Sequence, residues 1–185
     1  MRIAKTFIFG AAAAAVAVGF TAAPAAAAPT ASTVVTFDIG AGTLDIVAPA
    51  SADLGTGSPG GTIDAALGPV TVTDGRASAD ASWIASVTST NFVTGTGTPS
   101  EVILASEVDY WSGPATATTG NGTFTPGQPT AADAAPLDNA VALTAFTHVG
   151  GTGNNSATWD PTLVVNVPLD SEAGTYTGTV THSVA

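Results

Sequence analysis

The sequence predicts an all-β protein, a single antiparallel β-sandwich of immunoglobulin-like or jelly-roll-like type, and three observations support this prediction. Beyond residue 33, apolar side chains recur at every second position, as in a strand with one buried and one solvent-facing side. Turns rich in glycine and proline separate these stretches, and no window has the spacing of an amphipathic helix. Many short strands with regular turns and no helix are typical of a sandwich.

The C-terminal region contains the clearest strands. One side of the predicted strand 175–184 carries Tyr176, Gly178, Val180, His182 and Val184, whereas threonine and serine occupy the other side. The run 162–167 alternates in the same way and stops at Pro168, so residues 168–174 are predicted to form a hairpin or a sheet-switching connection.

The same pattern predicts shorter strands upstream, over 34–39, 43–47, 70–73, 82–88, 102–110 and 143–148. Residues 120–136 are rich in glycine and proline without any period, which predicts a long, mobile surface loop. The inward-facing positions predict a core that includes Trp83, Val87, Leu163, Val165, Val167, Tyr176 and Val180.

The N-terminus has the pattern of a signal peptide. Arg2 and Lys5 precede an apolar run of about 14 residues, which is shorter than the roughly 20 residues of a spanning helix. Small residues follow, and Ala25-x-Ala27 matches a cleavage site. We therefore expect residues 1–27 to be removed, residues 28–33 to form a short tail, and residues 34–185 to form the domain of an exported protein with no stable membrane span.

Charge excludes several kinds of partner. The chain has 3 basic and 14 acidic side chains, and Arg76 is the only basic residue beyond the predicted leader. Nucleic-acid binding requires basic side chains that neutralise phosphates, so we expect no nucleic-acid partner. The absence of cysteine excludes disulfides, thiolate nucleophiles and zinc–thiolate sites.

Catalytic motifs are weak, and we expect a protein that is not an enzyme, with no catalytic residue and no cofactor. Gly55-x-Gly57-x-x-Gly60 has dinucleotide-binding spacing, but no helix pattern follows it, so a turn is the better interpretation. A nucleophile would need His148 or His182 as its base, and no Gly-x-Ser-x-Gly elbow is present.

Two binding hypotheses remain open. Tyr110 and Trp111 lie at a predicted strand end beside a turn, where they either stack on a sugar ring or pack at the sheet edge. Loop acids either bind calcium or are solvated, and the calcium candidates are Asp74, Asp80, Asp170 and Glu172. Because no Asp-x-Asp-x-Asp-Gly loop exists, we assign no metal-binding residue.

Two segments resemble the WxL domain of Gram-positive surface proteins. Asp74-x-Arg76 followed by Trp83 looks like the family's Asp-x-Arg turn and first Trp-x-Leu motif, although the sequence reads Trp83-Ile84-Ala85. The closing strand with Tyr176 is also similar, but His182-x-Val184 stands where the second Trp-x-Leu is expected.

The resemblance implies a non-enzymatic module, secreted or on the cell surface, that associates non-covalently with peptidoglycan of the cell wall or with other surface proteins. The alternative is a free secreted β-domain that binds carbohydrate or calcium.

Two residues carry specific expectations. Arg76, as the only cation after the leader, is predicted to pair with Asp74 or Asp80. His182 is predicted to face inward and to be neutral at pH 7, with one hydrogen bond, because burial penalises the charged imidazole.

Overall fold

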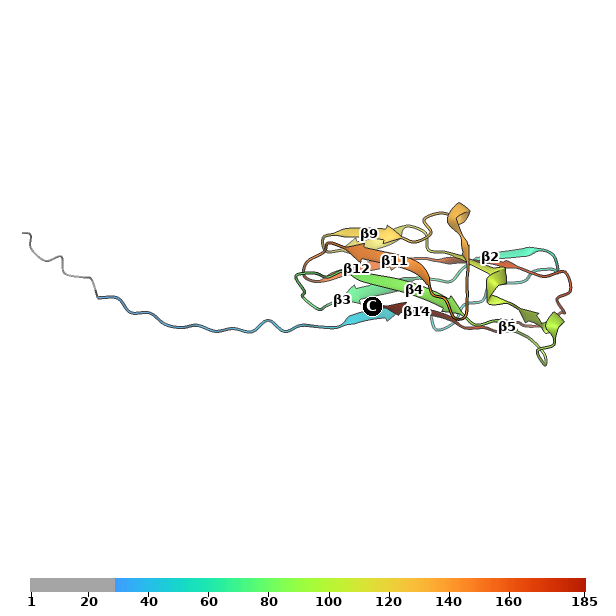
Figure 1. Cartoon of the computed structure of the whole chain (residues 1–185), viewed down its shortest axis with the longest axis horizontal. Helices are drawn as coiled ribbons and strands as arrows, with labels where there is room; N and C mark the ends of the chain where they lie inside the picture. Colours follow the sequence, from blue (N-terminus) through green and yellow to red (C-terminus); the bar gives the residue numbers. More distant parts are fainter. Residues whose placement is uncertain (1–28) are drawn as a thin grey trace, which may run out of the picture. The chain divides into compact units, whose positions relative to one another are not determined.

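The computed structural model describes residues 29–185, and the predicted signal peptide and its cleavage position lie outside the described residues. Asp38–Ala185 form one compact unit (Figure 1). This unit is all-β, every strand pairing is antiparallel, and the sheets are arranged as a sandwich, which confirms the predicted class. In the described part of the chain, no helix is long and apolar enough to cross a membrane.

Three four-stranded sheets and one two-stranded ribbon make up the unit. The first sheet, in spatial order, consists of β1 (Leu44–Val47), β3 (Val70–Asp74), β12 (Asn155–Trp159) and β8 (Ala115–Thr119). The second consists of β10 (Ala135–Pro136), β7 (Val108–Trp111), β13 (Thr162–Asn166) and β2 (Thr62–Ala66). The third consists of β14 (Val180–Val184), β4 (Trp83–Ser89), β11 (Leu143–Val149) and β9 (Thr123–Pro126). The ribbon pairs β5 (Phe92–Val93) with β6 (Val102–Ile103), and 3₁₀ turns lie at Pro99–Glu101, Ala105–Glu107 and Ala131–Asp133.

The core lies between β4 and β11 of the third sheet and strands of the other two sheets. Trp83 from β4 and Phe146 from β11 have ring centroids 6.4 Å apart, and Phe146 stacks on Trp159 of β12 at 4.9 Å. All three rings are almost completely buried. Large aromatic side chains contribute much of the buried apolar surface of a core, so this cluster joins the two faces of the sandwich.

Four of the seven predicted core residues are confirmed as buried, namely Trp83, Val87, Leu163 and Val165. The other three, Val167, Tyr176 and Val180, are half-buried and pack against that cluster. Their partial exposure has a structural reason, because all three line an open groove.

The predicted strand 34–39 is wrong. Residues 29–37 are extended and exposed, and β1 begins only at Leu44. A strand requires a partner edge as well as β-forming residues. The ladder with β3 reaches no further than Gly42 and Thr43, which bond to Gly75, so residues 34–39 have no partner among the described residues.

Other boundaries also need correction. The predicted strand 102–110 is divided into β6, a 3₁₀ turn and β7, and regular pairing in 175–184 covers only β14. The predicted loop 120–136 contains β9, which pairs with β11 and places Phe124 against the ring of His148 at 4.3 Å. Strands β2, β8 and β12 were not predicted, because their short threonine- and alanine-rich runs lack a strong apolar alternation.

Candidate functional site

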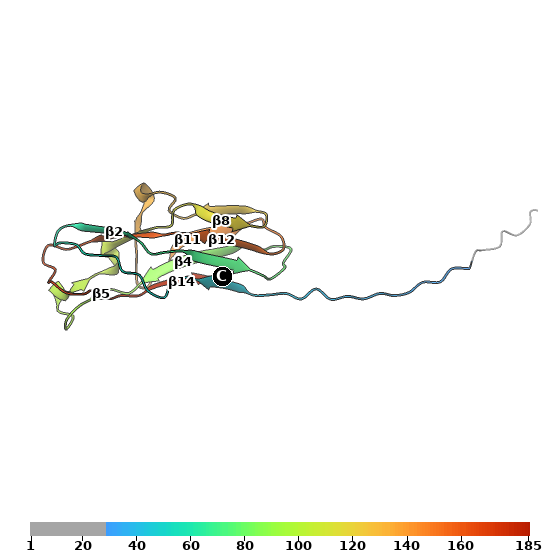
Figure 2. The same ribbon diagram turned by 180° about the vertical axis from the view of Figure 1, so that it is seen from behind.

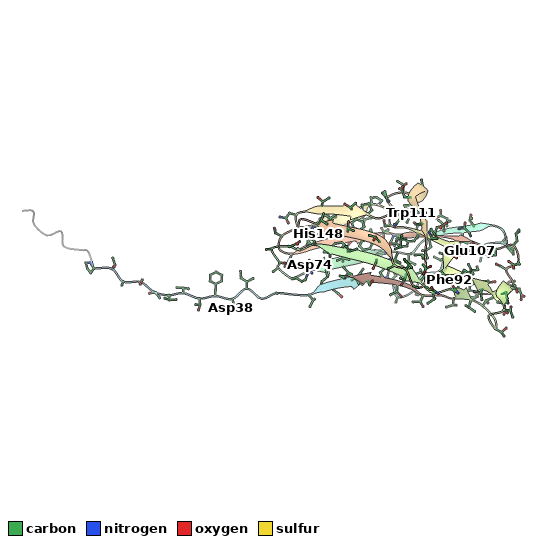
Figure 3. All side chains as sticks on the ribbon, viewed as in Figure 1. Asp38, Asp74, Phe92, Glu107, Trp111 and His148 are labelled. Carbon is green, nitrogen blue, oxygen red and sulfur yellow. The ribbon has the colours of Figure 1, made fainter. Side chains whose placement is uncertain are left out.

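An open groove of about 900 Å³ is lined by residues of β2, β5 and β13. Strands β2 and β5 lie at the same end of the sandwich (Figure 1, Figure 2). Figure 3 shows Phe92 near this end, whereas Asp74 and His148 lie toward the opposite end. The large apolar side chains that line the groove come from separate parts of the chain, and they are Leu54, Ile63, Leu67, Phe92, Ile103, Leu163, Val165, Val167, Tyr176 and Val180. We call this hollow the seam groove.

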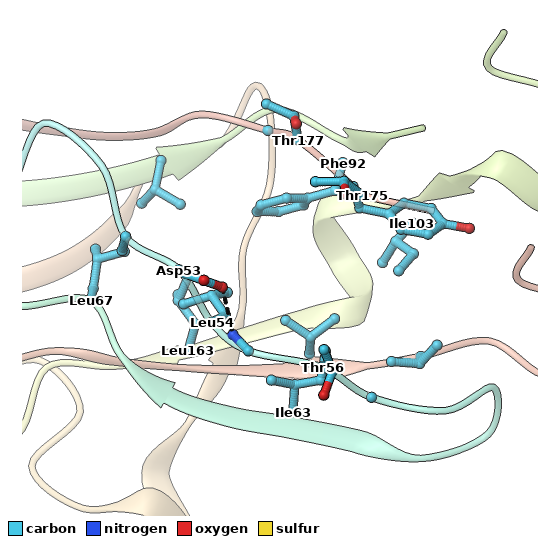
Figure 4. Close-up of a pocket in the computed structure, with 18 of the residues that line it drawn as sticks. Asp53, Leu54, Thr56, Ile63, Leu67, Phe92, Ile103, Leu163, Thr175 and Thr177 are labelled. Atoms are coloured by element: carbon cyan, nitrogen blue, oxygen red, sulfur yellow. Dashed lines mark hydrogen bonds between the residues drawn. The ribbon is translucent and has the colours of Figure 1, made fainter. Parts of the chain in front are cut away.

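Two walls bound the seam groove. Strand alternation turns Leu163 and Val165 of β13 to the same side, Val167 directly after the strand also lines the groove, and Ile63 of the neighbouring β2 joins them. Figure 4 shows Ile63 and Leu163 on one wall and Phe92 and Thr177 on the opposite one. The walls therefore belong to different sheets, and the groove is a place where the two faces of the sandwich are not closed by a strand.

The segment 48–57 crosses the seam groove and lines part of it. Its one hydrogen bond within the described chain is internal, from the Gly55 backbone N–H to Oδ1 of Asp53 at 2.9 Å (Figure 4). Leu54 is the largest apolar side chain that this segment contributes to the lining. Because no ladder holds this segment to β2 or β14, its attachment rests on a few side-chain contacts.

An unpaired strand edge runs beside the seam groove. Ala185 exchanges two backbone hydrogen bonds with Ile84, and Thr177 exchanges two with Val93. Antiparallel ladders alternate, so the odd-numbered residues from 177 to 185 bond inward. The backbone N–H and C=O groups of the even-numbered residues face the other way, where no described strand forms a ladder with β14, although β1 packs against part of it. These residues are Tyr176, Gly178, Val180, His182 and Val184.

A buried hydrogen-bonded chain supports the inner end of the groove. Nε1 of Trp159 donates to the Tyr110 hydroxyl at 3.1 Å, and that hydroxyl lies 3.2 Å from Nε2 of His182. An indole N–H only donates, so the Tyr110 hydroxyl accepts from Trp159 and makes its second hydrogen bond with Nε2 of His182, whose Nδ1 is buried without a partner among the described residues. Burial raises the pKa of Tyr110 above its usual value and lowers the pKa of His182 to about 4. The expected inward position and single hydrogen bond of His182 are confirmed.

This lowered pKa predicts a loss of stability on acidification. The unfolded chain takes up a proton on His182 near the ordinary pKa of 6.5, whereas the folded chain takes it up only near 4. Between these values the unfolded state binds more protons, so the free energy of unfolding falls as the pH drops from about 6.5 to 4. We expect a loss on the order of 1–2 kcal/mol from this residue, measured by urea unfolding at pH 7 and pH 4.5.

The comparison variant is His182→Phe, which cannot titrate. Its stability should decline less over the same pH range than that of the unmodified protein. Equal declines in the two proteins would show that His182 does not contribute to the pH dependence.

Arg76 pairs with Asp74 as predicted, at the end of the sandwich remote from the groove. Nε and Nη2 of Arg76 donate to the two carboxylate oxygens at 2.9 and 2.8 Å. The hydrogen bond from Arg76 is the main cause of the lowered pKa of Asp74, whose side chain is fully buried. Nδ2 of Asn155 also approaches Asp74, and Oδ1 of Asn155 accepts from Nε1 of Trp83 at 2.7 Å. The motif residues Asp74, Arg76 and Trp83 thus form one structural network.

Three of the four calcium candidates, Asp74, Asp80 and Glu172, are engaged with other groups. Both oxygens of Asp74 accept from Arg76, and Oδ1 of Asp80 accepts from the backbone N–H and the hydroxyl of Ser82. Glu172 accepts from the Ser100 hydroxyl at 2.7 Å. Among residues 29–185, no group of three or more acidic or histidine side chains is arranged to hold a metal ion.

The predicted sugar-stacking pair requires correction at Tyr110. Its side chain is completely buried and belongs to the core, so its ring offers no surface to a ligand. Trp111 is half-buried at the end of β7, where a role in binding stays a prediction. The alternation that puts Tyr110 inward places its neighbour on the other face.

His148 also lies in the interior. Its Nδ1 is 3.0 Å from the carbonyl oxygen of Ala81, and its Nε2 is 2.8 Å from that of Asn121. The ring is fully buried and therefore serves packing and hydrogen bonding.

The seam groove combines predicted and unpredicted residues. Tyr176, His182 and Val184 were singled out from the closing strand, and the structure places Tyr176 and His182 on the groove. Leu54, Ile63 and Phe92 were missed. In the sequence, each of these three residues lies in a short segment that is otherwise mostly polar or small. This pattern does not show that the three side chains lie together in the fold.

No family model, curated protein or solved structure matches this chain.

Proposed function

We propose that this chain is a non-enzymatic, exported surface module that binds an extended polypeptide segment of another surface protein in the seam groove. The observation that carries the proposal is the unpaired backbone edge of β14 beside an apolar hollow. In strand addition, an extended segment pairs with an open sheet edge and inserts alternate side chains into pockets.

The lining favours a polypeptide over a polysaccharide. Sugar binding typically uses exposed aromatic faces with polar side chains at their margins, whereas this groove has only two aromatic side chains besides His182, and its large apolar side chains are mainly aliphatic. The Tyr176 hydroxyl is already engaged with the carbonyl oxygens of Ser100 and Glu172, at 3.0 and 2.9 Å. A polypeptide strand has backbone donors and acceptors at the same spacing as the outward-facing N–H and C=O groups of β14. The hydroxyl groups of a sugar polymer do not have this spacing.

Export and surface location rest on the sequence. The basic residues, apolar run and Ala25-x-Ala27 pattern support secretion. The WxL-like elements Asp74-x-Arg76 and Trp83 support a place at the cell surface, where the partner is another surface protein with an extended apolar segment. The wall polymer peptidoglycan is the competing partner.

Peptide binding tests this function. The probe is a synthetic eight-residue peptide, acetyl-KTVTFTVK-amide, titrated against the protein by isothermal calorimetry. We expect saturable binding, and at least tenfold weaker binding when alternate backbone nitrogens of the peptide are methylated, because methylation removes the hydrogen bonds to β14 and keeps every side chain.

A parallel sedimentation with purified peptidoglycan separates the two partners. Retention on peptidoglycan without binding of the peptide would overturn the proposal. Equal affinities of the methylated and unmethylated peptides would also contradict it, because strand addition depends on the peptide backbone.

A further inference from the structure

We propose that the segment that fills the seam groove is residues 34–39 of a second copy of this chain, so that copies join head to tail. This inference rests on the proposed function and names its partner. Two features of the same molecule, each incomplete alone, support it. One is an exposed segment with the pattern of a strand, and the other is a groove beside an unpaired strand edge.

The donor segment has the composition of a strand without a sheet. Val35, Phe37 and Ile39 share one face, and they are 79, 82 and 80 % exposed. Thr36 and Asp38 lie on the other face. A contiguous run of exposed apolar side chains on a soluble domain usually marks an interaction surface. This pattern is the one that strand addition requires, with apolar side chains inward and polar ones outward.

The acceptor has the dimensions for this donor. Six extended residues span about 20 Å, and the part of the edge that lines the groove, from Tyr176 to His182, is seven residues, or about 23 Å, long. Even-numbered residues along that edge offer backbone donors and acceptors at every second position. Three apolar donor side chains would meet the lining formed by Leu54, Ile63 and Phe92.

Tethering keeps residues 34–39 of the same chain away from the part of the groove that is lined by Ala48 and the residues after it. Gly42 donates a backbone hydrogen bond to Gly75 at 2.7 Å, so the chain is held in the ladder from that residue onward. Ile39 lies three residues before Gly42, a reach of at most about 11 Å. The groove segment starting at Ala48 is six residues beyond Gly42 along β1, or about 20 Å. Filling that part of the groove from the same chain would require β1 to unpair.

The geometry of donor and acceptor sets the type of assembly. They are different surfaces of one molecule, so their contact is heterologous and does not close as a two-fold dimer does. Each added copy would bring its own empty groove, and linear oligomers would grow with concentration.

Light scattering coupled to size exclusion tests this assembly on the protein recovered from the medium of an exporting cell. We expect the mean mass to rise at least twofold between 1 and 200 µM. The variant F37D should stay monomeric at both concentrations. Phe37 is exposed, so this change leaves the folded unit intact, which an unchanged melting temperature checks. The matched control V141D introduces the same charge at a valine outside the donor segment, which is 70 % exposed, and this variant should still assemble.

A peptide of residues 31–41 separates this inference from the proposed function. It should bind the F37D variant and should block assembly of the unmodified protein. If acetyl-KTVTFTVK-amide binds and the 31–41 peptide does not, the self-association is wrong and the groove function stands. If neither peptide binds, both are wrong. A monomeric unmodified protein that loses thermal stability on F37D would place the segment within its own chain and overturn the second-copy proposal.

Discussion

Replacing Arg76 with alanine is expected to lower the free energy of unfolding by about 3 kcal/mol at pH 7. The Asp74 carboxylate has no exposed surface, and Arg76 supplies two of its hydrogen bonds. The Arg76 side chain is 35 % exposed, but its removal takes the charged donor away from a buried carboxylate, which costs more than losing a pair in which both side chains are exposed. Chemical denaturation at pH 7 measures the difference.

Two further variants test the cause. Asp80→Asn changes an exposed neighbouring acid and should cost less than about 1 kcal/mol. The double variant R76A/D74N removes the buried charge together with its partner and should recover part of the loss. A loss below about 0.5 kcal/mol for R76A alone would show that Asp74 does not depend on the pair.

The pair also has a pH signature. The pKa of Asp74 is lowered in the folded state, chiefly by the hydrogen bond from Arg76. The contribution of Asp74 to the free energy of unfolding is therefore fully present above the ordinary carboxyl pKa of 3.8. It is lost as the pH falls through the lowered pKa of the folded state. This loss begins below the range in which His182 acts.

Tyr110→Phe is the second large effect, with an expected loss of about 2 kcal/mol. The hydroxyl accepts from Nε1 of Trp159 and lies against Nε2 of His182, so its removal leaves two enclosed polar atoms without partners. An unsatisfied buried donor or acceptor costs its full desolvation penalty, which exceeds the net value of an average hydrogen bond.

Tyr176→Phe is the matched control. Its hydroxyl bonds to two backbone carbonyl oxygens, but the side chain is only half-buried, so water can replace the lost partner. We expect a cost below about 1 kcal/mol for this variant. Equal losses for the two variants would contradict the role assigned to the buried chain of hydrogen bonds.

Alternation predicted the class of fold and much of the core. Trp83, Val87 and Leu163 were placed inward because a period of two fixes which side of a strand each residue occupies. The same rule failed for residues 34–39. Alternating apolar and polar residues show that a segment has the pattern of a strand. Whether the segment joins a sheet depends on a partner strand with an unpaired edge close to it.

The groove was less predictable than the core. His182 and Tyr176 could be placed on the inner face of the closing strand, yet the hollow itself is made by Leu54, Ile63 and Phe92 from distant segments. Their meeting depends on the sheet order, in which β2 and β14 are edges of different sheets. Sheet order is set by long-range pairing, which local sequence patterns do not encode.

Amide hydrogen exchange along β14, resolved residue by residue by NMR, tests most directly whether this edge binds a strand. In the dilute protein, the amides of Val180, His182 and Val184 should exchange faster than those of Thr181 and Ser183, because only the odd-numbered residues bond to β4. Upon addition of the 31–41 peptide or of acetyl-KTVTFTVK-amide, exchange at the even-numbered residues should slow at least tenfold. Unchanged exchange at these amides under saturating amounts of both peptides would contradict strand addition in the seam groove.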